Sequence, residues 1–140
     1  MNRNVITIIL LFFFLSVTAC ISKEGLQAGE PVITTISTEE AALLAESKDD
    51  SGLVIIDIRT PPEYEGGIIE GAINIDYYAP DFRDEIDALD RNGTYLIYCR
   101  TGNRSGRSKA LFAGLGFSEV YDMGGGIVKW AREERPVVEP

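Results

Sequence analysis

The sequence contains a candidate nucleophile but none of the imidazole bases that usually activate one. Its 140 residues include two cysteines, Cys20 and Cys99, and no histidine. A Ser-His-Asp triad, a Cys-His pair and histidine metal ligands are therefore excluded. A structural zinc ion usually needs four Cys or His ligands and this chain has two, so we predict no metal site. A reactive cysteine in this chain must be activated by another device.

The segment that starts at Cys99 has the composition of an anion-binding loop. It reads Cys99-Arg100-Thr101-Gly102-Asn103-Arg104, and a predicted helix follows. Backbone N–H groups of such a loop can point inward, and the helix start adds partial positive charge. Gly102 and Asn103 tolerate the left-handed backbone of a tight loop. With Arg100 and Arg104, these features favour the thiolate, so we predict a lowered pKa and a catalytic role for Cys99, against the alternative of an inert strand-end thiol.

The distribution of charge supports a small anionic substrate. The chain has a net charge of −9, which argues against nucleic acid as a partner. Residues 91–118 carry no acidic residue but contain five basic ones, Arg91, Arg100, Arg104, Arg107 and Lys109. A basic segment on an acidic protein attracts anions locally. Arg107 and Lys109 also fit a solvated helix face, whereas we expect Arg100 and Arg104 to serve the loop.

The apolar pattern predicts the elements that position this loop. Continuous apolar runs at 53–56 and 95–98 are typical of strands buried on both faces. We predict strands at 32–36, 53–56, 72–75, 95–98 and 120–121, helices at 38–47, 81–89, 105–115 and 127–133, and a long loop from 61 to 67. This alternation favours an α/β fold of three layers, with a mainly parallel sheet of about five strands and helices on both faces. Ligands of such sheets bind beyond the carboxyl ends of the strands.

The N-terminal residues predict export and lipid anchoring. An uncharged apolar run from Val5 to Ala19 is 15 residues long. It is short for a membrane span and suits a signal peptide better, although a short anchor is the alternative. Val17-Thr18-Ala19-Cys20 resembles the bacterial lipobox, which implies cleavage before Cys20 and lipid attachment to it. We therefore predict a signal peptide at 1–19, a lipidated Cys20 with a flexible tether at 20–31, a folded domain at 32–138, and a location in the bacterial cell envelope.

Four segments in this order resemble the single-domain rhodaneses, a family of sulfurtransferases. Asp57–Tyr64 resembles the family's D-x-R-x-x-x-E-[FY] stretch, and Gly67–Asn74 resembles G-H-I-x-G-A-x-N. Tyr98–Ser105 resembles the catalytic loop, and Gly124–Trp130 resembles the closing G-G-x-x-x-W. The resemblance covers about residues 32–135 and implies a rhodanese-like fold. Ile68 replaces the family's usual histidine, a departure that concerns packing of that loop rather than the chemistry.

The resemblance also implies a reaction and roles for residues. The Cys99 thiolate would take sulfur from thiosulfate or a persulfide and pass it to a thiol or cyanide, with no cofactor. Thr101, Gly102 and Asn103 would line the substrate site, with Arg100 and Arg104 holding the oxyanion. Asp57, Arg59 and Ser105 would support the loop, and Asp57 and Arg59 are equally compatible with a purely structural ion pair.

Two other functions compete with this one. A persulfide carrier that delivers sulfur from Cys99 to a partner protein would have the same sequence features. A cysteine phosphatase or arsenate reductase of related fold is disfavoured, because the loop from Cys99 to Arg104 has six residues and leaves less room for a tetrahedral phosphate. For either sulfur-handling function we expect a monomer.

Overall fold

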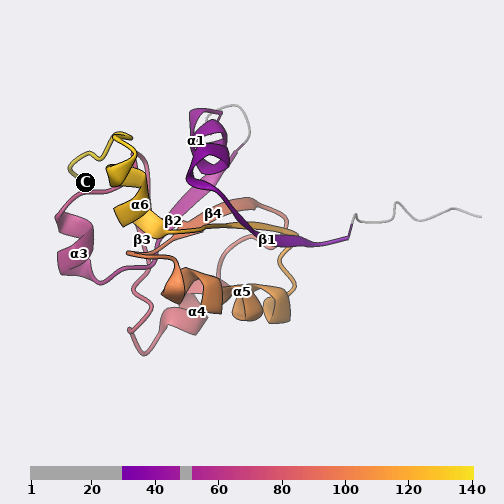
Figure 1. The fold of residues 1–140 in the computed structure, drawn as a ribbon. Coiled ribbons are helices and arrows are strands. Elements are labelled where there is room, and N and C mark those ends of the chain that lie inside the picture. The colour runs from indigo at the N-terminus through magenta and orange to yellow at the C-terminus, as the bar shows by residue number, and fades with distance from the viewer. Residues whose placement is uncertain (1–29, 48–51) are drawn as a thin grey trace, which may run out of the picture.

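Five parallel strands form the centre of the fold in the order β1-β5-β4-β2-β3 (Figure 1). The computed structural model describes residues 30–47 and 52–140. The strands are β1 (Val32–Ile36), β2 (Val54–Asp57), β3 (Ile73–Asn74), β4 (Thr94–Tyr98) and β5 (Glu119–Met123). In the register, Asp57 lies beside Tyr98. Because all five strands are parallel, their carboxyl ends gather at one edge of the sheet.

Helices cover both faces of this sheet, so the fold has three layers (Figure 1). The helices are α1 (Thr38–Glu46), α3 (Pro61–Glu65), α4 (Phe82–Asp87), α5 (Asn103–Leu115) and α6 (Gly126–Arg132). Two separate apolar cores result, one between the sheet and α1 with α6, the other between the sheet and α4 with α5. Leu96 of β4 packs in the first core, and its neighbour Ile97 packs in the second. This alternation of side chains explains why β4 is apolar from Tyr95 to Tyr98.

The structure confirms the predicted order of strands and helices, with shifts at several ends. The helix after Ser37 begins as its capping pattern predicts: the Ser37 hydroxyl accepts from the Glu40 N–H, and the Glu40 carboxylate accepts from the Ser37 N–H. Strand β5 has five residues rather than two. Helix α5 begins at Asn103, two residues before the predicted start, so its first turn includes part of the predicted loop.

The prediction of a continuous loop from 61 to 67 is wrong, because Pro61–Glu65 form the short helix α3. Two consecutive prolines suggested a loop, yet proline suits the first turn of a helix, where no N–H is needed for the helical ladder. The carboxylate of Glu63 accepts hydrogen bonds from the N–H and the hydroxyl of Thr60, at 3.1 and 2.9 Å. Thr60 and Glu63 thus close the helix start, a capping signal that the proline pair obscured.

Helix α6 begins directly against the backbone that follows β4. The Ile127 N–H donates to the Cys99 carbonyl at 3.0 Å, and the Val128 N–H donates to the Arg100 carbonyl at 3.1 Å. Gly126 has a φ of +58°, and a Cβ at this position would lie 2.5 Å from the Cys99 carbonyl oxygen. The glycine therefore permits a close backbone contact that holds the segment after β4.

The predicted signal peptide at 1–19, Cys20 and most of the tether lie outside the described residues. Within residues 30–47 and 52–140, no helix combines the length and the apolar character that a membrane crossing requires.

We expect Gly126→Ala to destabilise the protein by about 2 kcal/mol or more, because the new methyl group meets backbone and the left-handed conformation becomes strained. Gly114→Ala is the matched control: Gly114 lies inside α5, and a Cβ there would meet nothing within 4 Å beyond its chain neighbours and the backbone of its own helix. That change should stabilise the protein by up to about 1 kcal/mol. Urea unfolding measures both. Gly126→Ala with wild-type stability would contradict the packing described above.

Candidate active site

The thiol of Cys99 lies at the carboxyl end of β4, in the core shared with α4 and α5. It is 1% exposed and is a free cysteine. The Gly102 N–H donates to its sulfur at 3.1 Å, and the buried Ser105 hydroxyl donates to it at 3.5 Å. The sulfur therefore lies in a ring of donors formed by the loop and the first turn of α5, the arrangement that suits an anion.

These donors determine the direction of the Cys99 pKa. Burial by itself raises the pKa, because it penalises the charged thiolate. Hydrogen bonds from the N–H and hydroxyl of Ser105, and from the N–H groups of Thr101 and Gly102, outweigh this effect and lower the pKa below its ordinary value. The direction agrees with the sequence prediction, and it shows how a thiolate can be stabilised without histidine.

Gly102 gives the loop its turn into α5. Its φ is +88°, and it occupies the N-cap position of the helix. A Cβ at Gly102 would lie 2.9 Å from the backbone nitrogen of Gly125, so the loop and the start of α6 pack backbone to backbone. This contact fixes the direction of the Gly102 N–H toward the sulfur.

Asp57 and Arg59 form a buried ion pair at the end of β2. The Arg59 Nε donates to both carboxylate oxygens of Asp57 at 2.9 Å, and Nη2 donates to the Gly67 carbonyl at 2.7 Å. Burial lowers the pKa of Arg59, but the bonds to Asp57 outweigh it and raise that pKa. Among the described residues, no side-chain hydrogen bond links this pair to the segment 99–104. The observed contacts of Asp57 and Arg59 stabilise the turn at Gly67. They therefore favour a purely structural role for this ion pair.

Arg104 lies in the first turn of α5, and its guanidinium is already occupied. It donates two hydrogen bonds to the carboxylate of Glu63, from Nη1 at 2.9 Å and from Nη2 at 2.8 Å. The bonds from Arg104 lower the pKa of Glu63 to about 2, although burial acts against this. The sequence analysis expects Arg104 to hold the oxyanion of a donor and does not anticipate this partner. Glu63 is visible in the quoted D-x-R-x-x-x-E-[FY] stretch, but nothing in the sequence indicates that it reaches α5.

The other predicted substrate residues lie on the surface of the loop. Arg100, Thr101 and Asn103 are exposed. Within the described part of the chain, the Arg100 side chain has no carboxylate partner. The structure thus brings Cys99, Gly102 and Ser105 together, leaves Arg100 accessible at the same loop, and pairs Arg104 with Glu63. Within residues 30–47 and 52–140, no group of three or more His, Cys, Asp or Glu side chains could hold a metal ion.

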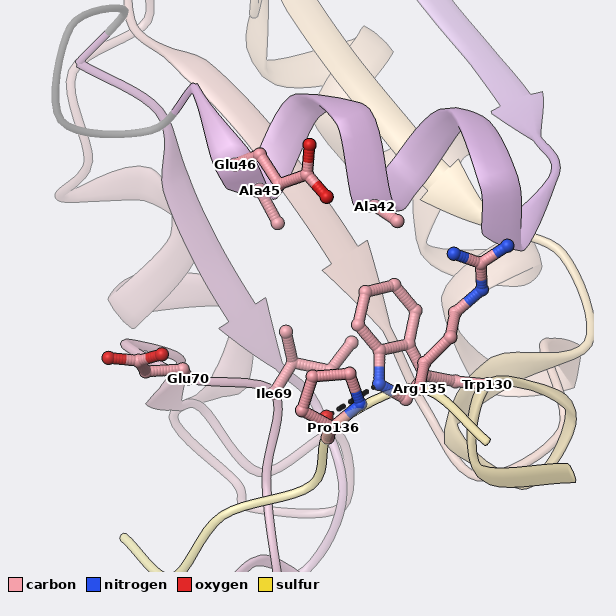
Figure 2. Close-up of a pocket in the computed structure, with 8 residues that line it drawn as sticks. All are labelled: Ala42, Ala45, Glu46, Ile69, Glu70, Trp130, Arg135 and Pro136. Atoms are coloured by element: carbon pink, nitrogen blue, oxygen red, sulfur yellow. Dashed lines mark hydrogen bonds between the residues drawn. The ribbon is translucent and has the colours of Figure 1, made fainter. Parts of the chain in front are cut away.

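A pocket of about 200 Å³ lies between α1 and the segment that follows α6 (Figure 2). Its lining consists of Ala42, Ala45, Glu46, Ile69, Glu70, Trp130, Arg135 and Pro136. Trp130 Nε1 donates to the Pro136 carbonyl at 2.8 Å, which closes one side (Figure 2). The Cys99 side chain belongs to the core on the opposite face of the sheet. This pocket is therefore separate from the cysteine site.

Comparisons with known proteins agree with this geometry. Residues 40–133 match the sequence profile of the family described as Rhodanese-like domain. A sulfurtransferase of Allochromatium vinosum is 33% identical over 97 residues, covering 69% of this chain and 86% of that protein. The thiosulfate sulfurtransferase GlpE of Pseudomonas entomophila is 40% identical over 96 residues, covering 68% of this chain and 82% of that protein.

Solved structures confirm the predicted fold class. A rhodanese-related protein from Thermoplasma volcanium superposes with a TM-score of 0.62 at 32% identity, covering 74% of this chain and 96% of that one. A rhodanese-like domain from Anabaena superposes with a TM-score of 0.65 at 20% identity, covering 76% of this chain and 79% of that one. The second likeness concerns the fold alone.

Ser105→Ala tests the hydrogen bonds to sulfur. Loss of the hydroxyl should raise the pKa of Cys99, so that alkylation by iodoacetamide at neutral pH slows roughly two- to fivefold and its pH profile moves to higher pH. Ser108→Ala is the control, because the Ser108 hydroxyl donates to the Arg104 carbonyl and not to sulfur. An unchanged profile in Ser105→Ala would mean that this hydroxyl does not stabilise the thiolate.

Proposed function

This chain belongs to the Rhodanese-like domain family, and from that membership we propose that it transfers sulfane sulfur through a persulfide on Cys99. The family match and the sulfurtransferase relatives support a sulfurtransferase activity. The donor in this proposal is thiosulfate or a persulfide, and the acceptor is a thiol or cyanide. The observation that carries the proposal is the buried Cys99 sulfur, which accepts hydrogen bonds from Gly102 and Ser105.

With thiosulfate as donor, the reaction has two balanced steps. The Cys99 thiolate attacks the outer sulfur of thiosulfate, a new S–S bond forms, and the original S–S bond breaks as its electron pair leaves with sulfite. The acceptor thiolate or cyanide then attacks the outer sulfur of the Cys99 persulfide. The electron pair of that bond returns to Cys99, which regenerates the thiolate. Neither step requires a proton, so neither requires the histidine that the chain lacks.

The loop supplies what these steps need. N–H groups and the Ser105 hydroxyl stabilise negative charge on the sulfur before attack and again after transfer. Arg100, exposed beside Cys99, is available for the anionic end of a donor. The GlpE relative is named as a thiosulfate sulfurtransferase, which supports thiosulfate as the first donor to test.

Treatment of the full chain with thiosulfate should add one sulfur atom to Cys99, and cyanide should then release thiocyanate with saturable kinetics. Peptide mass spectrometry locates the added sulfur. Cys99→Ser should abolish both signals, while Cys20→Ser should retain them. Added sulfur on any residue other than Cys99 would refute the assignment. A stable persulfide with negligible turnover would instead identify a carrier that delivers sulfur to a partner protein.

We also propose that the protein is exported and held at a membrane by lipid on Cys20. The lipobox-like segment Val17-Thr18-Ala19-Cys20 supports this proposal. Because several acyl chains anchor a protein firmly, loss of the acceptor cysteine should release it.

Cys20→Ser should therefore move the full chain from the membrane fraction to the soluble fraction of expressing bacteria. Cys99→Ser is the matched control, since it removes the other thiol and should stay with the membranes. Retention of Cys20→Ser in the membrane fraction would show that lipidation does not hold the protein, and that the apolar run itself does.

A further inference from the structure

The Cys99 site has fewer available positive charges than its sequence suggests. Arg104 is largely buried, with 13% of its side chain exposed, and both terminal nitrogens donate to Glu63. Arg59 is likewise paired with Asp57. Among the arginines at the carboxyl ends of β2 and β4, Arg100 alone has no carboxylate partner within the described part of the chain. Of Arg59, Arg100 and Arg104, only Arg100 is therefore unpaired and available to a donor anion in the described residues.

Glu63 is held firmly in the position that neutralises Arg104. Its carboxylate accepts from Thr60 at the start of α3 as well as from Arg104. It comes from a helix 41 residues away from Arg104 in the chain. The low pKa of Glu63, about 2, means that the carboxylate stays ionised at any pH where the protein would work. Four hydrogen bonds therefore hold the ionised Glu63 carboxylate between Thr60 and Arg104.

Arg104 is nevertheless close enough to the sulfur to matter. It directly precedes Ser105, which bonds the sulfur, and its charge interacts electrostatically with Cys99. Without Glu63, its guanidinium would be a second cation for a donor anion. The Glu63 carboxylate therefore determines whether Arg104 is available to a donor anion in addition to Arg100.

An exposed aromatic ring lies beside the Glu63–Arg104 ion pair. The Tyr78 ring faces the Arg104 guanidinium at 5.4 Å, and 68% of Tyr78 remains exposed. It is the most exposed large apolar side chain among the described residues. The apolar face of this ring offers contact to an organic group of a donor.

We propose that Glu63 is a specificity-determining residue that favours sulfane donors with one negative charge and an organic group over dianionic thiosulfate. The inference rests on the proposed function and specifies which class of sulfur donor the site prefers. For an organic persulfide, the Cys99 thiolate attacks the terminal sulfur, the S–S bond of the donor breaks, and the electron pair leaves with the organic thiolate. Atoms and charge balance as they do for thiosulfate.

Methanethiosulfonate and thiosulfate are a matched pair of probes, because a methyl group in the first replaces a charged oxygen in the second. We expect the wild-type chain to have the higher kcat/KM with methanethiosulfonate. Glu63→Gln frees Arg104 while its remaining oxygen can still cap Thr60. This change should raise kcat/KM for thiosulfate roughly fivefold, the scale of one accessible charge contact, and alter that for methanethiosulfonate less than twofold.

Three further variants separate charge from structure. Arg104→Gln leaves Glu63 unpaired and should lower thiosulfate use by a similar factor. The double variant Glu63→Gln/Arg104→Gln is neutral, as the native pair is, and should return to within twofold of wild type. Glu65→Gln removes one charge from the same helix and should leave the donor ratio unchanged. If Arg104 itself binds the donor, the double variant will lose thiosulfate use as Arg104→Gln does, and the proposal is overturned.

A binding measurement distinguishes this proposal from the proposed function. In full-length Cys99→Ser, which cannot accept sulfur, calorimetry with thiosulfate should show roughly fivefold tighter binding when Glu63→Gln is added. Unchanged binding would overturn the role of Glu63 even if the enzyme turns over. The wild-type chain could instead transfer sulfur from neither thiosulfate nor methanethiosulfonate, while Glu63→Gln still tightens thiosulfate binding in Cys99→Ser. That result would overturn the proposed function but would support the electrostatic role of Glu63. If thermal unfolding shows that Glu63→Gln does not fold, the thiosulfate kcat/KM of Glu63→Gln/Arg104→Gln is the deciding measurement. A value within twofold of wild type supports the proposal, and a loss equal to that of Arg104→Gln overturns it.

Discussion

A sulfur anion that is removed from water must be solvated by the protein, and this requirement organises the region around Cys99. The thiol is almost wholly buried, so the penalty of burial acts against the reactive form. Here the hydrogen-bond donors that point at the sulfur overcome that penalty. The loop after β4 and the first turn of α5 supply them, chiefly through Ser105 and Gly102. The absence of histidine is then no obstacle, because fixed hydrogen-bond donors do the work of a neighbouring cation.

Such donors are effective only if they are already in place. Reorganising a loop during the reaction would cost part of what its hydrogen bonds contribute. Here α6 restrains the backbone from outside: its first N–H groups bind the carbonyls of Cys99 and Arg100. Gly102 and Gly126 let the two segments approach at backbone contact distance. The G-G-x-x-x-W segment thus acts on the cysteine through packing, although none of its side chains bonds the sulfur.

The sequence predicts the fold well because the fold depends on local apolar patterns. Runs such as that of β4 are apolar at every position only when both faces are covered, and capping at Ser37 is a contact between near neighbours. The lowered Cys99 pKa is predictable for the same reason, since its donors lie within six residues. The sequence does not predict helix α3, because a pair of prolines is compatible both with a loop and with the first turn of a helix. The Glu63–Arg104 pair was missed because residues 41 positions apart meet only once the sheet is formed.

That missed pair changes the electrostatic picture of the site. Counting arginines along the segment suggests a strongly positive cradle, but charges act in space rather than in sequence. Asp57 neutralises Arg59, and Glu63 neutralises Arg104, both through direct hydrogen bonds between the charged groups. What remains near the sulfur is a set of oriented dipoles, and of Arg59, Arg100 and Arg104 only Arg100 lacks a carboxylate partner within the described residues. Dipoles of this kind stabilise a thiolate whatever anion approaches it. A second cation would instead strengthen the binding of donors that carry more negative charge. In the proposal above, the hydrogen bonds that stabilise the nucleophile come from Gly102 and Ser105, whereas the selection of the donor comes from Glu63.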